Sequence, residues 1–389
     1  MMKCETIKIL MAGWYPLDAD KLYGGPYYNT YLQVRTLIEH PDVRIEVITR
    51  SQDCKQNRTI YSDGLIIHVV AEPSSRIVPR QYTMVAKVAR AMQGLHPDIV
   101  ISHNRIETLA AHKAGLPTVY IRHGITRHET RLAHGFDKLV GILGDMVERK
   151  ALRSVGDVIC ISDYGIRASC EETSAKIHKI SYPIVEDEFF SCPEYSSEKG
   201  VLFAGVINPL KNLLTLIEAW PAVLSDNPQA HLRVCGRVSD KHYLLQVQER
   251  IASLGIEDSV ELLGLVGRCE LMNLMRDSAC LVLPSRQENM PNVISQSLAC
   301  GRPVIATAVG GIPEMVDDGV TGFILDTPDN VGGFADRIGK LLSNPALTRQ
   351  MGNAGKQAAL KRFERHAHIE QLLNICKKAM ASQQVIKRM

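Results

Sequence analysis

Long hydrophobic runs are missing from this sequence of 389 residues. No stretch approaches the ~20 apolar residues that a membrane-spanning helix requires, so no span is predicted. Blocks of one charge sign are missing too, since 45 Lys and Arg stand against 42 Asp and Glu. The formal net charge of +3 makes nucleic acid an unexpected partner. The first apolar run has no small-residue cleavage site after it, which predicts a strand in a cytoplasmic protein and not a signal peptide.

Paired cysteines and a dinucleotide-binding glycine motif are also missing. The ten cysteines include no C-x-x-C pair and no Cys/His ligand spacing, so neither a metal site nor a cofactor is predicted. Cys160, Cys235 and Cys280 lie inside apolar runs, where a free cysteine is typically a small buried hydrophobe. No G-x-G-x-x-G follows the first strand, which argues against a dinucleotide-binding oxidoreductase.

What the sequence does have is a regular alternation of strand-like and helix-like segments. Many strand-like runs are continuously apolar, as expected of parallel strands buried on both faces. Helices between such strands make right-handed crossovers. Strands are predicted at residues 7–13, 44–50, 65–70, 98–102, 118–122, 157–162, 200–206, 231–235, 260–263, 279–284, 303–307 and 322–325. Helices are predicted at residues 29–39, 80–92, 211–225 and 243–254, among others.

The length of the chain predicts two α/β domains, because one hydrophobic core rarely serves so many residues. We expect two doubly wound, Rossmann-like domains, 1–190 and 197–365, facing each other across a cleft and joined by a polar linker near 188–199. Residues 366–389 are expected to form a final helix, and its return to the first domain is left open. Ligands of such sheets bind beyond the carboxyl ends of the strands, so the strand-to-helix turns are the candidate sites.

The first candidate turn carries Gly24 and Gly25 ahead of a helix. Adjacent glycines leave backbone N–H groups accessible at the positive end of the helix dipole, which suits a phosphate. An ordinary tight turn is the alternative. Asp18 and Asp20 form an Asp-x-Asp in the same turn, but we interpret them as a solvated turn without a metal.

The second candidate turn carries Lys211, after the first strand of the second domain. Lys211 is expected to open the next helix, where the dipole disfavours a cation. This placement favours a role as a point charge for a diphosphate. A solvated lysine at a helix start is the alternative.

The third candidate turn follows the strand that ends at Ser285. Asn289 or Asn292 is expected to cap the next helix, whose first N–H groups suit an anionic or polyhydroxyl ligand. Glu288, just ahead, can accept hydrogen bonds from sugar hydroxyls, although a simple partner for the helix dipole is the alternative. Gln296 lies about one turn into the helix and faces the same region.

Residues 285–325 resemble the signature of the family 4 retaining glycosyltransferases, which share the two-domain GT-B fold. That pattern is Ser-x-x-Glu-Gly-Phe-Pro, a second Glu eight residues after the first, Ala-x-Gly-x-Pro-Val, and Gly-Gly-x-x-Glu. The opening strand with its Gly-Gly turn and the segment GVINPLK are similar to the same family. The residues in register are Ser285, Glu288, Pro291, Ala299, Gly301, Pro303, Val304, Gly310, Gly311 and Glu314.

The resemblance implies a role for each matching residue. Glu288 would grip the hydroxyls of the donor sugar, and Lys211 would bind the donor diphosphate. Gly24 and Gly25 would face that phosphate from the first domain. His123 falls at the family's His-Gly position, close to the transferred sugar. The loop that holds sugar and phosphate would consist of Asn289, Met290, Pro291, Asn292 and Val293.

Two positions depart from the family pattern. Val206 stands where an arginine usually pairs with the diphosphate, and Arg237 or Arg286 is a candidate replacement. Gln296 stands where a glutamate usually holds the donor ribose. A neutral amide makes hydrogen bonds roughly half as strong as those of a carboxylate, so we expect weaker donor binding but not lost chemistry.

The resemblance implies a retaining, metal-independent hexosyltransferase. It would move a sugar from a nucleotide sugar, with a UDP-sugar favoured, to a glycan or lipid-linked acceptor in bacterial surface polysaccharide assembly. No side chain is an evident covalent nucleophile, which favours front-face attack. The alternative is a non-catalytic member that binds a nucleotide sugar or a partner protein. Residues 127–153 mix basic and apolar residues at helical spacing, so peripheral contact with the inner face of the membrane stays open beside an ordinary surface helix.

Overall fold

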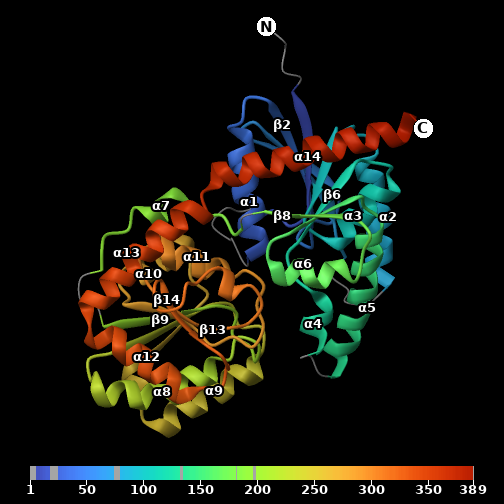
Figure 1. The fold of residues 1–389 in the computed structure, drawn as a ribbon. Helices are drawn as coiled ribbons and strands as arrows, with labels where there is room; N and C mark the ends of the chain where they lie inside the picture. Colours follow the sequence, from blue (N-terminus) through green and yellow to red (C-terminus); the bar gives the residue numbers. More distant parts are fainter. Residues whose placement is uncertain are drawn as a thin grey trace. The chain divides into compact units, whose positions relative to one another are not determined.

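The computed structural model divides into two compact units (Figure 1). The first unit contains the described residues up to Tyr182 together with those from Arg365 onward. The second unit comprises Pro183–Glu364. Gly24, Asp18 and Asp20 lie outside the described residues. No helix in the described part of the chain is long and apolar enough to cross a membrane. The structure describes residues 6–17, 25–73, 79–131, 135–180, 182–195 and 199–388.

The first unit is built on an eight-stranded sheet in the order β3-β4-β2-β1-β5-β6-β7-β8. All pairs are parallel except β3 with β4, which is antiparallel. The strands are β1 (Ile7–Ala12), β2 (Val43–Ser51), β3 (Arg58–Ser62), β4 (Leu65–Ala71), β5 (Ile99–Ser102), β6 (Thr118–Arg122), β7 (Asp157–Cys160) and β8 (Lys176–Lys179). The helices are α1 (Gly25–Ile38), α2 (Pro79–Met92), α3 (Arg105–Lys113), α4 (Thr126–Arg131), α5 (Gly135–Arg153), α6 (Asp163–Cys170) and α14 (Arg365–Arg388).

The predicted strands of the first unit are present, and two more were not predicted. The central strands β5, β6 and β7 are buried along their whole length, as their apolar sequences indicated. The two missed strands, β3 and β8, lie at the edges of the sheet and have the sequences RTIYS and KIHK. Their side chains are mostly exposed or half-buried, so neither carries an apolar run that sequence reasoning could detect.

The C-terminal helix α14 is part of the first unit, where it packs against α1 (Figure 1). Gln33 of α1 and His368 of α14 are joined by a hydrogen bond of 2.8 Å between their Nε2 atoms. Arg365 lies 3.7 Å from Glu39, beyond the end of α1. The helix is therefore joined to α1 by a buried polar contact between Gln33 and His368.

The second unit contains a fully parallel six-stranded sheet in the order β11-β10-β9-β12-β13-β14. Helices α8, α9 and α12 cover one face, and α11 and α13 cover the other (Figure 1). The strands are β9 (Gly200–Ala204), β10 (His231–Cys235), β11 (Val260–Gly264), β12 (Cys280–Leu283), β13 (Val304–Thr307) and β14 (Gly322–Leu325). The helices are α7 (Asp187–Phe190), α8 (Leu213–Asp226), α9 (Lys241–Leu254), α10 (Arg268–Arg276), α11 (Asn292–Ala299), α12 (Val331–Ser343) and α13 (Pro345–Arg362).

Both sheets have a point where the strand order reverses. It lies between β1 and β5 in the first unit and between β9 and β12 in the second. At such a point the loops after the two strands diverge to opposite faces and leave room for a ligand at the carboxyl edge. The side chains that follow these four strands are therefore the first place to look for function.

Candidate functional site

A lysine and a glutamate meet at the reversal point of the second unit. Lys211 lies in the turn after β9, two residues before α8 begins at Leu213, and so precedes the helix instead of opening it. Glu288 lies in the loop after β12. The Lys211 ammonium forms an ion pair with Glu288 Oε1, and the Ser285 hydroxyl donates to the same oxygen over 2.9 Å. The side chain of Glu288 is 8% exposed and that of Lys211 is 21% exposed, so the pair is shielded yet reachable.

This contact changes how the two residues work. From the sequence they were assigned separately, one to a sugar and one to a diphosphate. In the structure each charge is compensated by the other, which avoids the penalty of a buried unpaired ion. A ligand that uses both groups must therefore exchange the Lys211–Glu288 contact for its own, with hydroxyls on the carboxylate and an anion on the ammonium.

The loop around Glu288 is held against the turn after β13. Gly310 has a φ of +59°, and a Cβ at this position would lie 1.8 Å from the Glu288 carbonyl oxygen. The Gly311 N–H donates to the Asn289 carbonyl over 2.9 Å. Glycine at 310 is thus needed both for its left-handed backbone and for the close approach of two chain segments.

Helix α11 begins behind this loop without a side-chain cap. The N-cap position is taken by Pro291, so the prediction that Asn289 or Asn292 caps the helix is wrong. The fixed φ of proline, here −71°, sets the entry into the helix. Gln296 lies one turn along α11 and is 6% exposed, which makes it a buried amide and not a surface group.

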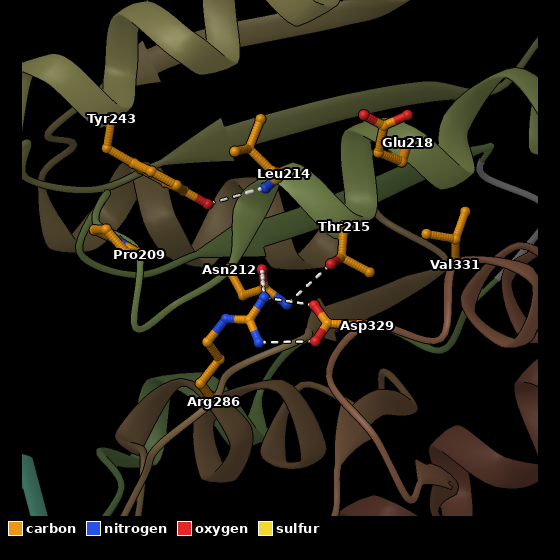
Figure 2. A pocket seen from close by; sticks show the side chains of 9 residues that line it. All are labelled: Pro209, Asn212, Leu214, Thr215, Glu218, Tyr243, Arg286, Asp329 and Val331. Carbon is orange, nitrogen blue, oxygen red and sulfur yellow. Dashed lines mark hydrogen bonds and ion pairs between the residues drawn. The ribbon is translucent and has the colours of Figure 1, made fainter. Parts of the chain in front are cut away.

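A second polar cluster in this unit involves Arg286 (Figure 2). Its guanidinium forms a two-pronged ion pair with Asp329, at 2.5 and 2.8 Å, and also donates to Asn212 Oδ1 over 3.1 Å. These groups border a cavity of about 340 Å³. The hydrogen bond with Arg286 lowers the pKa of Asp329 below its ordinary value. The cavity is lined by Pro209, Asn212, Leu214, Thr215, Glu218, Tyr243, Arg286, Asp329 and Val331.

Arg286 and Arg237 differ in how far their charges are committed. Arg286 is compensated by Asp329, as Figure 2 shows. Arg237 is exposed, and its carbonyl accepts from the Ile207 N–H over 2.9 Å, which puts it beside the segment that contains Val206. Of the two candidate replacements for the missing arginine, Arg237 is the one whose backbone neighbours that position.

His123 in the first unit belongs to a hydrogen-bonded chain at the strand ends. Its Nε2 lies 2.7 Å from His103 Nδ1, and its Nδ1 lies 3.0 Å from the Tyr182 hydroxyl. His103 Nε2 in turn lies 3.0 Å from Met11 Sδ. A thioether sulfur can accept a hydrogen bond but has no hydrogen to donate. Met11 therefore assigns the Nε2–H tautomer to His103, then to His123, with Tyr182 donating to His123 Nδ1.

Both histidines of this chain are neutral. Burial lowers the pKa of His123 to about 3 and holds that of His103 well below its ordinary value. Burial likewise raises the pKa of Tyr182 well above its ordinary value. Gly13, with a φ of +153°, allows this packing, since a Cβ there would lie 2.9 Å from the His103 Cβ. These hydrogen-bonded side chains therefore present oriented dipoles at the strand ends and carry no net charge.

Comparison with known proteins places these two sites in one family. The pattern described as Glycosyltransferase Family 4 matches residues 30–184, and that described as Glycosyl transferases group 1 matches residues 185–358. Together they span most of the chain and both sites. The chain belongs to the family 4 glycosyltransferases. The predicted family and the GT-B fold class are thereby confirmed.

One relative and two solved structures match this glycosyltransferase over nearly its whole length. A D-inositol 3-phosphate glycosyltransferase of Saccharomonospora viridis is 25% identical over 97% of this chain and 95% of its own. Sucrose-phosphate synthase of Thermosynechococcus elongatus has a TM-score of 0.79 at 18% identity, covering 97% of this chain and 100% of that one. HepE of Anabaena in complex with UDP-glucose has a TM-score of 0.70 at 19% identity, covering 96% and 100%.

Sequence reasoning about this glycosyltransferase missed three contacts. Ser285 was part of the matched pattern, but its hydrogen bond to Glu288 was not foreseen. His103 directly follows β5 just as His123 directly follows β6, and these strands are neighbours. That repeat of a strand-end histidine was a usable signal. Tyr182 gave none, because it comes 59 residues after His123. No group of His, Cys, Asp and Glu suited to a metal ion is found within the described residues.

Proposed function

We propose that the protein is a retaining, metal-independent hexosyltransferase with a UDP-sugar donor and a glycan or lipid-linked acceptor. The observation that carries this proposal is the Lys211–Glu288 pair at the reversal point of a family 4 glycosyltransferase. The bond that breaks in a nucleotide sugar joins a diphosphate to a sugar. The Lys211 ammonium suits the diphosphate, and the neighbouring Glu288 carboxylate can accept hydrogen bonds from the sugar hydroxyls. Bacterial surface polysaccharide assembly is the use we favour, in a cytoplasmic protein.

Each candidate site residue of the second unit has a task in this reaction. Lys211 stabilises the negative charge that grows on the leaving diphosphate. Glu288 accepts hydrogen bonds from the sugar hydroxyls, and Ser285 keeps its carboxylate oriented. The segment from Asn289 to Val293 supplies main-chain contacts, with Met290, Pro291 and Asn292 between these two residues. Gln296 accepts from the ribose.

The chemical step is a front-face displacement. A bond forms between an acceptor hydroxyl oxygen and the anomeric carbon while the bond from that carbon to the diphosphate oxygen breaks. The hydroxyl proton passes to the leaving phosphate. The proposal also assigns His123 to the transferred sugar, and the backbone N–H groups of Gly24 and Gly25 to the donor phosphate, as the family resemblance implies.

A UDP-sugar is favoured because the structural relative HepE has been solved with UDP-glucose, although that likeness is one of fold. The test is a screen of UDP-, GDP- and ADP-sugars for thermal stabilisation and slow donor hydrolysis. We expect one UDP-sugar to stabilise the protein and to be hydrolysed, and Glu288→Ala to abolish hydrolysis. The matched control is Glu218→Ala, since Glu218 lies in the same unit and is instead paired with Arg250 at 2.6 Å.

Each outcome of this screen has a distinct meaning. Stabilisation by a GDP- or ADP-sugar would leave the assignment as a transferase unchanged and would identify a different donor. Binding without hydrolysis or transfer would favour a non-catalytic nucleotide-sugar-binding member. If no nucleotide binds, Val206 and Gln296 are disabling changes and a partner-binding role takes precedence.

A peripheral membrane contact through residues 127–153 is part of the proposal. Leu139, Ile142 and Met146 on α5 are 54%, 47% and 58% exposed, and their spacing aligns them on one side of the helix. Lys150 and Arg153 in its last turn supply positive charge. We expect binding to anionic vesicles that falls when all three apolar residues are changed to Gln. Equal binding by that variant would reduce α5 to an ordinary surface helix.

A further inference from the structure

Two cysteines of the second unit lie side by side although they are far apart in the sequence. The Sγ atoms of Cys192 and Cys300 are 3.0 Å apart, although the two positions are separated by 108 in the sequence. Cys192 follows α7, and Cys300 caps the C-terminus of α11. Both are buried, at 7% and 0% exposed, and both are free thiols. None of the reactions proposed above uses them.

The two segments are fixed to each other by a buried arginine. Arg302 donates to the Pro193 carbonyl over 3.1 Å and to the Cys300 carbonyl over 3.0 Å, so one guanidinium holds the backbone beside each cysteine. Lys356 donates to the Cys192 carbonyl over 3.0 Å. The sulfur atoms therefore meet in a fixed frame and not by chance contact of two mobile loops.

The surroundings make the two thiols unequal. The hydrogen bond between the two thiols and the positive charges of Arg302, Lys356 and Arg276 lower the pKa of Cys192 to about 7. The same contact and burial raise the pKa of Cys300. Thiolates, not thiols, are the nucleophiles in cysteine chemistry. Cys192 is thus the reactive sulfur, and it keeps some exposed surface, whereas Cys300 holds its proton.

We propose that Cys192 and Cys300 form a reversible oxidation site, which a hydroperoxide converts into a disulfide. The Cys192 thiolate attacks one oxygen of hydrogen peroxide, the O–O bond breaks, and hydroxide leaves with a proton from solvent as water. The Cys300 sulfur then attacks the resulting sulfenic sulfur. An S–S bond forms, the S–O bond breaks, and the Cys300 proton leaves with the hydroxyl as a second water. Two thiols lose two electrons, which the peroxide gains.

Formation of this bond needs only a small movement. A disulfide has an S–S length of ~2.05 Å, so the sulfur atoms must close by about 1 Å from their 3.0 Å separation. The bond ties the chain just inside the second unit to the end of α11, the helix that carries Gln296. A cross-link between positions so distant in sequence restricts the unfolded chain, so the oxidised protein has the higher melting temperature.

The test is limited oxidation of the full-length protein with hydrogen peroxide, followed by peptide mapping. We expect a Cys192–Cys300 linked peptide, a mass lower by two hydrogens, a raised melting temperature, and full reversal by dithiothreitol. Cys192→Ser and Cys300→Ser each remove the linked peptide and the temperature rise. The matched control is Cys280→Ser, a buried cysteine without a sulfur neighbour among the described contacts, which leaves both unchanged.

Other products would overturn the proposal. The site is excluded if peroxide oxidises only the exposed Cys170 and Cys269. In that case Cys192 and Cys300 remain free thiols, and an alkylating reagent modifies both once the protein is unfolded. Sulfinic acid on Cys192 without a link to Cys300 excludes the disulfide. Peptide mapping of the oxidised parent protein distinguishes these products even if a serine variant folds poorly. Neither result depends on donor binding.

Discussion

Both units bury polar side chains at their strand ends, but the second unit uses charged groups and the first uses neutral ones. In the second unit, Lys211 and Glu288 keep opposite charges in contact. In the first, His103, His123 and Tyr182 form a neutral hydrogen-bonded chain that ends on the thioether of Met11. Lys211 and Glu288 follow β9 and β12, the two strands at the reversal of strand order. His103 follows β5 at the corresponding reversal of the first unit, whereas His123 follows the next strand, β6. The fold thus provides equivalent positions, and the side chains decide whether a position carries charge.

The difference follows from what burial costs each group. A carboxylate next to an ammonium loses little by leaving water, because each compensates the other. A buried imidazole without a counter-ion loses its proton instead, which lowers its pKa. Charge is needed where a diphosphate leaves, and orientation without charge suffices where a neutral sugar is placed. The proposed reaction divides the labour in that way.

The largest test of the comparison is removal of one charge from the second unit. Lys211→Met and Glu288→Gln each leave the partner uncompensated, and we expect donor hydrolysis to fall by ~10²–10³-fold, as for loss of one preorganised transition-state contact. Each single variant should also have a lower melting temperature, and the double variant should recover part of that loss. Single variants with hydrolysis within about threefold of the parent would contradict the assigned roles.

Arg237 tests whether a second cation supports the leaving diphosphate. We expect Arg237→Ala to weaken UDP binding by about 1.5–3 kcal/mol, the range for hydrogen bonds to charged groups, which corresponds to roughly 10–150-fold. Arg286→Ala is the matched control, because the charge of Arg286 is already compensated by Asp329. Calorimetric titration with UDP measures both. A larger loss for Arg286→Ala would transfer the role to Arg286.

Much of the fold and the charged half of the site could be predicted from the sequence. Strands such as β5 and β12 are buried on both faces, and their apolar runs reveal that directly. Lys211 and Glu288 stand at fixed distances from recognisable strand ends and motifs. The edge strands β3 and β8 could not be found, because exposed strands carry no hydrophobic period.

The contacts between site residues could not be predicted in the same way. That Lys211 touches Glu288, or that Tyr182 meets His123, depends on how distant loops pack, and no local pattern records it. The expected asparagine cap of α11 failed for a local reason, because a proline in the intervening position took over the helix start. The Gly24 assignment lies outside the described residues and stays a prediction.

The neutral chain of the first unit predicts a specific dependence of stability on pH. The unfolded chain protonates its histidines below about pH 6.5. Folded His123, with a pKa lowered to about 3 by burial, does not. The free energy of unfolding therefore falls as the pH drops from 6.5 towards 3, by ~1.4 kcal/mol per pH unit for each such histidine. His103 contributes in the same direction.

Denaturant unfolding between pH 7 and pH 5 measures this effect. We expect the stability advantage of the parent over His123→Gln to shrink as the pH falls, because the variant has one less proton to take up on unfolding. His112→Gln, which removes a histidine at an exposed position, is the matched control, and its stability is measured at the same pH values. Parallel curves for parent and His123→Gln would mean that His123 is not held neutral.

The smallest expected effect tests how much charge the second unit can still use. Gln296→Glu restores the carboxylate of the family pattern at a buried position one turn into α11. A charge-assisted hydrogen bond to a ribose hydroxyl is about 1 kcal/mol better than a neutral one, so UDP should bind roughly fivefold tighter. Gln287→Glu is the matched control and should leave binding unchanged. If the ribose does not reach position 296, the new carboxylate has no partner, and the variant loses stability without gaining affinity. Tighter UDP binding at an unchanged rate of hydrolysis would instead show that an added charge in the second unit improves affinity where the donor offers a hydroxyl to it. The strand ends of the first unit, by contrast, work with neutral histidines.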